Sequence, residues 1–575
     1  MYKKIYAKRI DNNKHLIHLW TDTGYEKIEW MNRSYIDIDK NQKYKDFKAQ
    51  YTGLNGESLI KTSNWRYTAD KESLNYSKNT VGLHFHDIPA HQKFLIEKYG
   101  IDDTPSITHK ELFFDIECEM LDDLSYNGIK KADKKVTSIA WYDKQVDEWG
   151  IVVLDEKNHF GTNIKTKSNK KIIPCRNEGE LLARFLEKFR EIDPDILVGW
   201  NSDFFDIPYL YFRMCNVLGE DFARHLSPIG TIRETPWFKD QYIQIAGVES
   251  LDYMRLHKKF SWAEESSMRL DAIGEKYAGI KKIEYEGNLD KLYEEDIATF
   301  IKYNFRDVEI LKALDEKLEY LALTKNLAHK GKHNYSEVYA NTKTQDGAIS
   351  AYLLSKNIIP PGKDPNPISK KNYAGGYLFC PKAGKMDYLF DLDLTSLYPS
   401  IIMTINIGKE TYVGRIIDSD DRNNRLGYND LKCMDYAEKM VVENKKRQQT
   451  RVNVGRIVKM IEQNDLLISA NGVMYSKDRE SVLSTILKKW FDERVKYKNA
   501  MKRAYKSGNK ELGAAYHMKQ YTMKILLNSL YGATALGSFR YGNVILSESI
   551  TLSGQRIIQE SALAANRAMN KEIKA

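Results

Sequence analysis

The stretch FFDIECEM, residues 113–120, decides the fold of the surrounding chain because it sets acids into an apolar strand. Side chains alternate between the two faces of a strand, so Phe114 and Ile116 point one way while Asp115 and Glu117 point the other. Two carboxylates on one face repel each other and resist removal from water. Lys or Arg partners, a shared proton and metal ions are the alternatives for neutralising them.

Outward from this stretch, strand-like and helix-like segments alternate from about residue 109. Such alternation favours an α/β domain in which helices cover a sheet. The apolar runs predict strands at 110–117, 136–143, 150–155 and 195–200, and further patterns predict helices at 178–192, 266–280 and 294–328.

The rest of the chain divides into further blocks. Residues 1–108 mix short β-like runs with polar turns, which predicts a small mixed domain. The Pro-rich segment 357–376 connects two blocks, and a second strand-like block begins at 388–402. Residues 478–531 are predicted to form two long helices joined near 507–510.

Length and composition limit the class of protein. A chain of 575 residues is too long for one core, so three or more domains are expected. Hydrophobic residues make up 42% and charged residues 29%, as in soluble globular proteins. There is no run of 18 apolar residues, which argues against a membrane span, and the polar start has no signal core, so we expect the cytoplasm.

Positive charge is concentrated in one segment. The net charge of the chain is +9, and residues 481–524 contain eleven Lys or Arg and three acids, a net charge of +8. A solvated helical face would account for such a run, but its concentration favours a polyanionic partner, either nucleic acid or nucleotide phosphates.

Two further segments place acids in apolar surroundings. Asp206 lies in GWNSDFFDIPYL, residues 199–210, and Asp307 follows Tyr303 by one helical turn in FIKYNFRDVEIL, residues 300–311. Each acid alone would suit a helix cap or the surface. Together with Asp115 and Glu117 they form a candidate site.

These segments carry a resemblance. DIE, NSDFFD and YNFRD resemble the three exonuclease motifs of family B DNA polymerases, and residues 247–279 are similar to the T-even bacteriophage branch. The resemblance implies 3′–5′ exonuclease chemistry with two Mg²⁺ ions, for which Mn²⁺ substitutes. It implies that Asp115, Asp206 and Asp307 ligate metal, that Glu117 ligates metal or orients the water, and that Tyr303 positions the water.

A second set of motifs is similar to the polymerase motifs of the same family. DLDLTSLYPSII at 391–402 resembles motif A, KILLNSLYG at 524–532 resembles motif B, and FDERVKYK at 491–498 resembles the fingers stretch that grips the triphosphate. The resemblance assigns metal binding to Asp393 and Leu394, and nucleotide binding to Leu394, Ser396, Leu397, Tyr398, Arg494, Lys498, Lys524 and Asn528. It assigns DNA contacts to Tyr373, Gly375, Gly376, Tyr531 and Gly532.

One expected motif does not follow. Family B polymerases carry a D-T-D strand turn after motif B, and the residues after Gly532 contain none. Asp393 therefore lacks the second aspartate of a two-metal site. We expect a C-terminal polymerase fragment with motif C and the thumb as a partner, so that this chain is either a portion of a longer polymerase or a subunit of a split polymerase. The other expected partners are primer–template DNA, deoxynucleoside triphosphates and, through the missing part, a sliding clamp.

The resemblance spans essentially the whole chain and implies a multidomain α/β and α+β fold. Two alternatives remain open: a stand-alone 3′–5′ exonuclease, and a regulator that binds RNA through residues 1–108. The expected domains are an N-terminal domain at 1–108 to which 325–372 return, a ribonuclease H-like exonuclease domain at 109–324, a partial palm at 373–477 that continues at 532–575, and two-helix fingers at 478–531.

Overall fold

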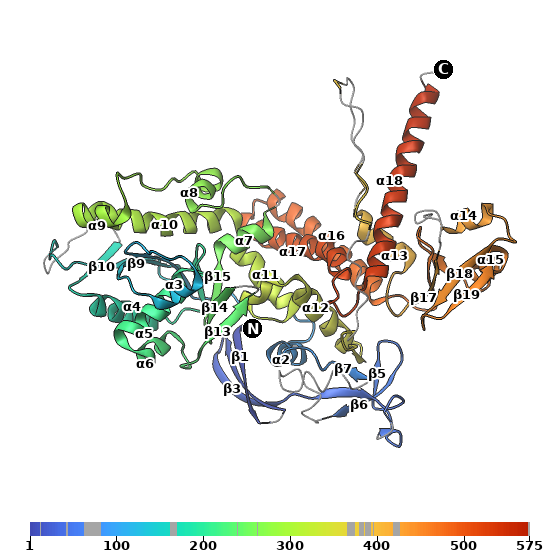
Figure 1. Ribbon diagram of the computed structural model, residues 1–575, viewed down its shortest axis with the longest axis horizontal. Coiled ribbons are helices and arrows are strands. Elements are labelled where there is room, and N and C mark those ends of the chain that lie inside the picture. The colour runs from blue at the N-terminus through green and yellow to red at the C-terminus, as the bar shows by residue number, and fades with distance from the viewer. Residues whose placement is uncertain are drawn as a thin grey trace. The chain divides into compact units, whose positions relative to one another are not determined.

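The chain forms two compact units, which are described separately (Figure 1). Unit 1 comprises Met1–Met31, Ala90–Leu95 and Asp102–Ala340, and unit 2 comprises Asn32–Pro89, Ile96–Ile101 and Asn341–Ala575. The predicted domain boundaries remain predictions. The computed structural model describes residues 1–11, 13–41, 44–62, 82–160, 170–237, 240–261, 263–364, 374–378, 384–385, 393–394, 396–417 and 426–572.

The centre of unit 1 is a six-stranded sheet with the order β11-β10-β9-β8-β12-β15. β8 pairs parallel with β12 and antiparallel with β9, so the sheet is mixed. The four strands expected from the sequence are all present, which confirms the α/β prediction for this region. The strands are β8 (Glu111–Cys118), β9 (Val136–Asp143), β10 (Glu148–Leu154), β11 (Lys170–Cys175), β12 (Ile196–Gly199) and β15 (Glu249–Asp252).

The two faces of β8 differ as the alternation of its residues predicts. Phe114 and Ile116 are buried in a core with apolar residues of α4 (Glu178–Ile192) and α5 (Asp206–Leu218). Each such side chain contributes about 1.5–3 kcal/mol by leaving water. The opposite face, which carries Asp115, is in contact with α10 (Ile297–Leu318).

Two predicted helices of unit 1 differ in detail from expectation. The helix expected at 266–280 begins only at Leu270, because Ser267 Oγ accepts a hydrogen bond from Arg269 N at 3.3 Å and so competes with helical bonding. The helix expected at 294–328 is instead the end of α9 (Leu289–Glu295) followed by α10 and α11, and Glu319 separates α10 from α11 in a left-handed conformation (φ 53°). The other helices and strands of unit 1 are β1 (Tyr2–Asp11), β2 (Lys14–Thr21), β3 (Gly24–Met31), α3 (Tyr126–Lys131), α6 (Glu220–Ala223), β13 (Ile232–Trp237), β14 (Asp240–Ile245), α7 (Tyr253–Phe260), α8 (Leu270–Ile273), α9 (Leu289–Glu295) and α11 (Tyr320–Gly331).

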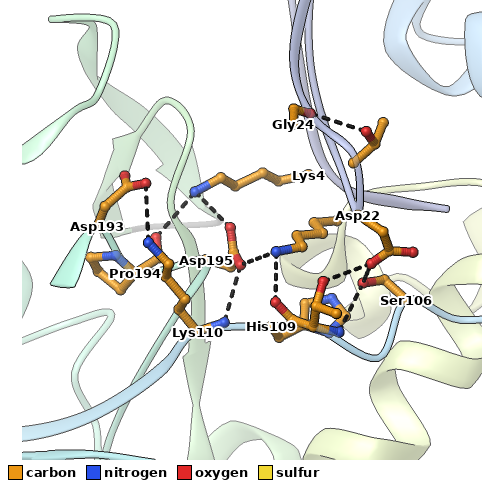
Figure 2. Close-up of polar contacts among 12 residues, drawn as sticks. Lys4, Asp22, Gly24, Ser106, His109, Lys110, Asp193, Pro194 and Asp195 are labelled. Carbon is orange, nitrogen blue, oxygen red and sulfur yellow. Dashed lines mark hydrogen bonds and ion pairs between the residues drawn. The ribbon is translucent and has the colours of Figure 1, made fainter. Parts of the chain in front are cut away.

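A buried ion-pair cluster fastens strand β1 to the beginnings of β8 and β12 (Figure 2). Lys4 Nζ lies 3.1 Å from Asp195 Oδ1 and donates to Pro194 O at 3.1 Å. The other carboxylate oxygen of Asp195 accepts from Lys3 Nζ at 3.2 Å and from Lys110 N at 3.1 Å. Asp195 therefore joins three segments of unit 1 that are distant in sequence.

Unit 2 contains two five-stranded sheets, with the orders β16-β5-β6-β4-β7 and β19-β18-β17-β21-β20. The two long helices expected at 478–531 are confirmed as α16 and α17, which pack along each other (Figure 1). The strands are β4 (Ser34–Asp37), β5 (Tyr51–Gly53), β6 (Ser58–Thr62), β7 (Leu83–His84), β16 (Ile358–Ile359), β17 (Tyr412–Ile417), β18 (Lys439–Asn444), β19 (Gln449–Asn453), β20 (Leu467–Ile468) and β21 (Val473–Tyr475). The helices are α12 (Asn341–Ser355), α13 (Leu397–Ile405), α14 (Tyr428–Cys433), α15 (Val454–Gln463), α16 (Val482–Lys506), α17 (Lys510–Thr534) and α18 (Val544–Glu572), and α2 (Ala90–Tyr99) has residues in both units.

The strand-like block predicted at 388–402 is wrong from Leu397 onward, where α13 begins. Pro399 lies in the first helical turn, where a missing N–H costs no hydrogen bond. Pro399, Ile401 and Ile402 are buried, so the apolar run serves a helix face. Residues 388–392 lie outside the described part of the chain. Among the described helices, none has the length and apolarity to span a membrane.

Candidate active site

Three of the predicted acids converge between β8 and α10. One carboxylate oxygen from each of Asp115, Glu117 and Asp307 lies within 4.8 Å of the other two. The fourth acid, Asp206, is the first residue of α5, and its Oδ1 accepts from Ile116 N at 3.3 Å, on the strand between Asp115 and Glu117. The site therefore combines the end of a strand with two helices.

Asn304 holds Asp115 in place. Asn304 Nδ2 donates to Asp115 Oδ2 at 2.7 Å, and Asn304 Oδ1 accepts from Ser138 Oγ at 2.9 Å. Asn304 precedes Asp307 by one turn of α10, so one helix supplies both an acid and the residue that orients another acid.

Lys282 brings positive charge into the cluster. Its ammonium forms an ion pair with Asp307 Oδ2 and donates to Tyr303 OH at 3.1 Å. Burial opposes that charge, but Asp307 and the neighbouring groups outweigh it and raise the pKa of Lys282 above its ordinary range. Lys282 is therefore charged in this site.

The acids are poorly compensated despite Lys282. Burial and the neighbouring acid Asp307 raise the pKa of Glu117 to about 8. Burial also raises the pKa of Asp206 to about 7, and burial with three neighbouring acids raises the pKa of Asp115 well above its ordinary value. The site therefore binds protons at neutral pH unless a further cation is present.

The donor set fits a divalent cation. Carboxylate oxygens are the ligands that Mg²⁺ prefers, and Asp307 Oδ1 is a buried oxygen with no hydrogen-bond partner. An uncompensated buried acceptor of this kind is costly unless something binds it. Asp115, Glu117 and Asp307, with Asp206 beside them, are the residues that could hold the metal.

Sequence reasoning missed Lys282 and Asn304. The helical spacing of Asn304 from Asp307 was a signal that could have found it, because i and i+3 share a face. Lys282 precedes α10 by a connection and the short helix α9, and its spacing from the acids carries no such signal.

Tyr398, a predicted nucleotide-binding residue, lies beside two residues predicted to contact DNA, Tyr531 and Gly376. Its ring stacks on that of Tyr531 with centroids 4.3 Å apart, which joins α13 to α17. A Cβ added at Gly376 would lie 3.1 Å from Tyr398 OH, and one at Gly554 would lie 3.0 Å from Tyr398 Cε1. Two glycines therefore leave the room that the Tyr398 ring occupies.

The other predicted residues of unit 2 lie on nearby elements. Ser396, directly before α13, has φ 56°, a strained conformation for a residue other than glycine. Gly375 O accepts from Gln555 Nε2 at 2.7 Å, while Asp393 and Leu394 are exposed. Tyr373 lies outside the described residues. Leu397 is on α13, Arg494 and Lys498 are on α16, and Lys524, Asn528 and Gly532 are on α17.

Comparison with known proteins gives two family matches. A family model described as "DNA polymerase family B, exonuclease domain" matches residues 60–273, and one described as "DNA polymerase family B" matches residues 339–575. The chain is 29% identical over 484 residues to a DNA-directed DNA polymerase of Escherichia phage RB69, covering 74% of this chain and 50% of the relative. It is 26% identical over 451 residues to the DNA-directed DNA polymerase of Enterobacteria phage T4 (69% and 47% covered), and 25% identical over 501 residues to a DNA polymerase of Pyrococcus glycovorans (83% and 54% covered). The chain thus spans about half the length of the curated relatives it matches.

Proposed function

Because the chain belongs to the family B DNA polymerases, we propose that it removes nucleotides from the 3′ end of DNA and supplies part of a template-directed polymerase site. The observation that carries the first activity is the convergence of Asp115, Glu117 and Asp307 within 4.8 Å. In this proposal the sheet of unit 1 is the ribonuclease H-like exonuclease domain, α16 and α17 are the fingers, and the protein acts in the cytoplasm.

The residues of the cluster divide the work of phosphodiester hydrolysis. Asp115, Glu117, Asp206 and Asp307 would hold Mg²⁺ or Mn²⁺, which when bound supplies positive charge for the attacking and leaving oxygens. Asn304 keeps Asp115 turned toward the cluster. Lys282 donates to the Tyr303 oxygen, so the Tyr303 hydroxyl proton is left to orient the attacking water.

The polymerase part of the proposal uses the residues around Tyr398. The stacked Tyr531 ring and the two glycines fix the Tyr398 ring, which can then exclude a ribose 2′-OH by contact. Arg494, Lys498 and Lys524 offer three cations to the triphosphate, with Asn528 further along the same face of α17 as Lys524. Asp393 with the backbone of Leu394 would bind metal, and the backbone amides near Ser396 and Leu397 would meet phosphate oxygens.

The proposed partners follow from the same reasoning. Primer–template DNA and deoxynucleoside triphosphates are the substrates, and Tyr373, Gly375, Gly376, Tyr531 and Gly532 would contact the DNA. A C-terminal polypeptide with the D-T-D motif and the thumb would complete the polymerase site and carry the sliding-clamp contact.

The test of the exonuclease is a double substitution. Asp115→Ala with Glu117→Ala should abolish the Mg²⁺-dependent shortening of 3′-recessed and single-stranded DNA by the purified chain. The fold should survive, because the change removes two partly buried acids whose ionised forms repel each other. The matched control is Asp122→Ala with Glu187→Ala, whose side chains are 87% and 72% exposed. Full activity in the first variant would refute the assignment.

A further inference from the structure

An exposed hairpin of unit 2 carries cations that the proposed active sites do not use. β18 and β19 with the turn between them, residues 439–453, are called the basic hairpin here. The hairpin carries five exposed cations, and none of them forms an ion pair within the described part of the chain. They are Lys439, Lys445, Lys446, Arg447 and Arg451.

The single acid of the basic hairpin is already neutralised. Glu443 is only 7% exposed, and it accepts from Arg415 Nε at 2.8 Å and from Gln449 Nε2 at 3.3 Å. A solvated surface usually mixes charges of both signs. Among the residues that the structure describes, the basic hairpin instead presents an unbalanced positive charge to solvent.

The cations lie on the turn and on the open face of the sheet. Directly paired residues share a face, and Met440 pairs with Val452 while Val441 pairs with Arg451. Met440 and Val452 pack into the core formed with α14 and α15. Arg451 and Lys439 consequently belong to the opposite face, which no helix of that core covers.

The sheet is anchored at its other end. Tyr475 OH of β21 hydrogen-bonds Ser549 Oγ of α18 at 2.9 Å, and Ala470 N donates to Ser553 Oγ at 3.1 Å. β18 is two strands away from β21, and β19 is a further strand out, so the hairpin extends about 10–14 Å beyond this anchor at ~4.8 Å per strand. The chain enters this sheet from α13 and leaves it to α16, which carry Tyr398 and Arg494.

We propose that the basic hairpin binds the phosphate backbone of primer–template duplex DNA. The inference rests on the proposed function for the identity of the polyanion. Five cations without an ion pair in the described part of the chain, three on the turn and two on the open face of the sheet, suit the phosphates of a duplex, and the contact needs no base readout. The chain runs from α13 through this sheet to α16, and both helices carry proposed nucleotide-binding residues, which favours the duplex that ends at that site.

The cations of the turn can be substituted without removing the side-chain contacts that hold the turn. Asn444 Oδ1 accepts from Lys446 N at 2.9 Å and from Gln448 N at 3.0 Å, so the turn is held by the Asn444 side chain and not by the cations. Arg447 has φ 62°, a conformation that asparagine tolerates well. The test variant is therefore Lys445→Gln, Lys446→Gln and Arg447→Asn in the full chain.

The measurement is the affinity for a primer–template duplex across a salt series, by fluorescence anisotropy without divalent cations. Each lost phosphate contact lowers the slope of log affinity against log salt by about 0.9. The triple variant should lose two to three units of slope, so that between 50 and 200 mM salt the wild type loses about 40-fold more affinity than the variant does. Adding Arg451→Gln to the triple variant should lower the slope by about a further 0.9, because one more phosphate contact is lost.

The matched control removes three positive charges elsewhere. Lys131→Gln, Lys317→Gln and Lys356→Gln change exposed lysines that have no ion pair in the described part of the chain, and they should leave the slope unchanged. Three results would overturn the proposal: an unchanged slope in the hairpin variant, an equal decrease of slope in the control, or a decrease seen with single-stranded DNA alone. The first result would point to an acidic protein as the partner of the hairpin. Exonuclease activity on single-stranded DNA, assayed separately, tests the proposed function and should be equal in all these variants.

Discussion

Lys282 can be tested against its exposed neighbour Lys281, because of the two only Lys282 pairs with an acid of the cluster. Lys282→Met should lower the rate of 3′-end degradation on the order of 10²-fold, because it leaves Asp307 and the Tyr303 hydroxyl without their shared donor. The exposed neighbour Lys281 pairs with Glu275 at 2.9 Å outside the cluster, so Lys281→Met is the matched control. Single-turnover degradation of a labelled strand measures both. Equal rates in the two variants would remove Lys282 from the mechanism.

Proton release should accompany metal binding at the same cluster. The pKa of Glu117 is raised to about 8 and that of Asp206 to about 7, so these carboxyls hold protons at neutral pH that a cation must displace. The apparent affinity for Mn²⁺ should therefore rise between about pH 6 and pH 8 and then level off. Titration calorimetry in two buffers of different ionisation enthalpy counts the protons released. The Asp115→Asn, Glu117→Gln variant should bind weakly and release fewer protons, because it lacks the Glu117 carboxyl. Wild-type binding that releases no protons would contradict the prediction.

At the scale of the elements, Glu111 fastens the beginning of β8 to two neighbours. Its carboxylate lies 2.7 Å from Lys144 Nζ, just after β9, and 2.6 Å from Lys325 Nζ of α11. Burial opposes the charge, but the two lysines outweigh it and lower the pKa of Glu111 to about 2 from an ordinary value of 4.5. The strand that presents Asp115 and Glu117 is thus held at its far end by charge.

This linkage predicts a pH-dependent loss of stability. A depressed carboxyl pKa stabilises the fold above the ordinary pKa, and the contribution disappears as the pH falls from about 4.5 to about 2. Glu111→Gln should therefore lower the free energy of unfolding by about 2–3 kcal/mol at pH 7, and the difference from wild type should shrink toward zero in acid. Thermal melting of both proteins from pH 7 to pH 3 measures this difference.

The control for Glu111 is an exposed pair. Glu316 is 61% exposed and pairs with Lys312 at 2.6 Å, so Glu316→Gln should cost less than about 0.5 kcal/mol at any pH. A Glu111→Gln difference that persists unchanged at pH 3 would show that shape and not charge is responsible.

Local sequence patterns predicted some helices and strands correctly and missed others. The strands of the central sheet follow from alternating apolar residues, and α16 and α17 follow from long helical patterns. α13 was missed because an apolar run of this length suits a strand or a buried helix equally well, and only its packing decides. The break at Glu319 likewise depends on where α11 must turn to pack.

At the scale of the whole molecule, we predict that the chain alone does not extend a primer. In the proposed polymerase site Asp393 is one metal-binding aspartate where nucleotidyl transfer needs two. Primer extension by the chain with the Asp115→Ala and Glu117→Ala substitutions should be undetectable. It should appear when a C-terminal polypeptide with the D-T-D motif is added.

The primer-extension result distinguishes a polymerase that needs a partner from a stand-alone exonuclease. A stand-alone exonuclease would degrade DNA in the unsubstituted chain and would gain no extension from any added polypeptide. Extension by the chain alone would refute the dependence on a partner, and extension only with the added polypeptide would establish a polymerase that acts in two parts.

The sequence by itself determined the direction of side chains along each element. Alternation along β8 put Asp115 and Glu117 on one face, and helical spacing put Tyr303 and Asp307 on one side of α10, because both periodicities are local properties of the backbone. The motifs then identified the family, which the comparisons confirmed.

Only the tertiary structure decided which residues complete the site. Asn304 reaches Asp115 across 189 positions of sequence, and Lys282 reaches Asp307 across 25. Local patterns state that a buried acid needs a partner, but the partner is whichever side chain the packing of β8 against α10 brings within reach. For the same reason the open face of the basic hairpin became visible only when the sheet showed which face α14 and α15 cover.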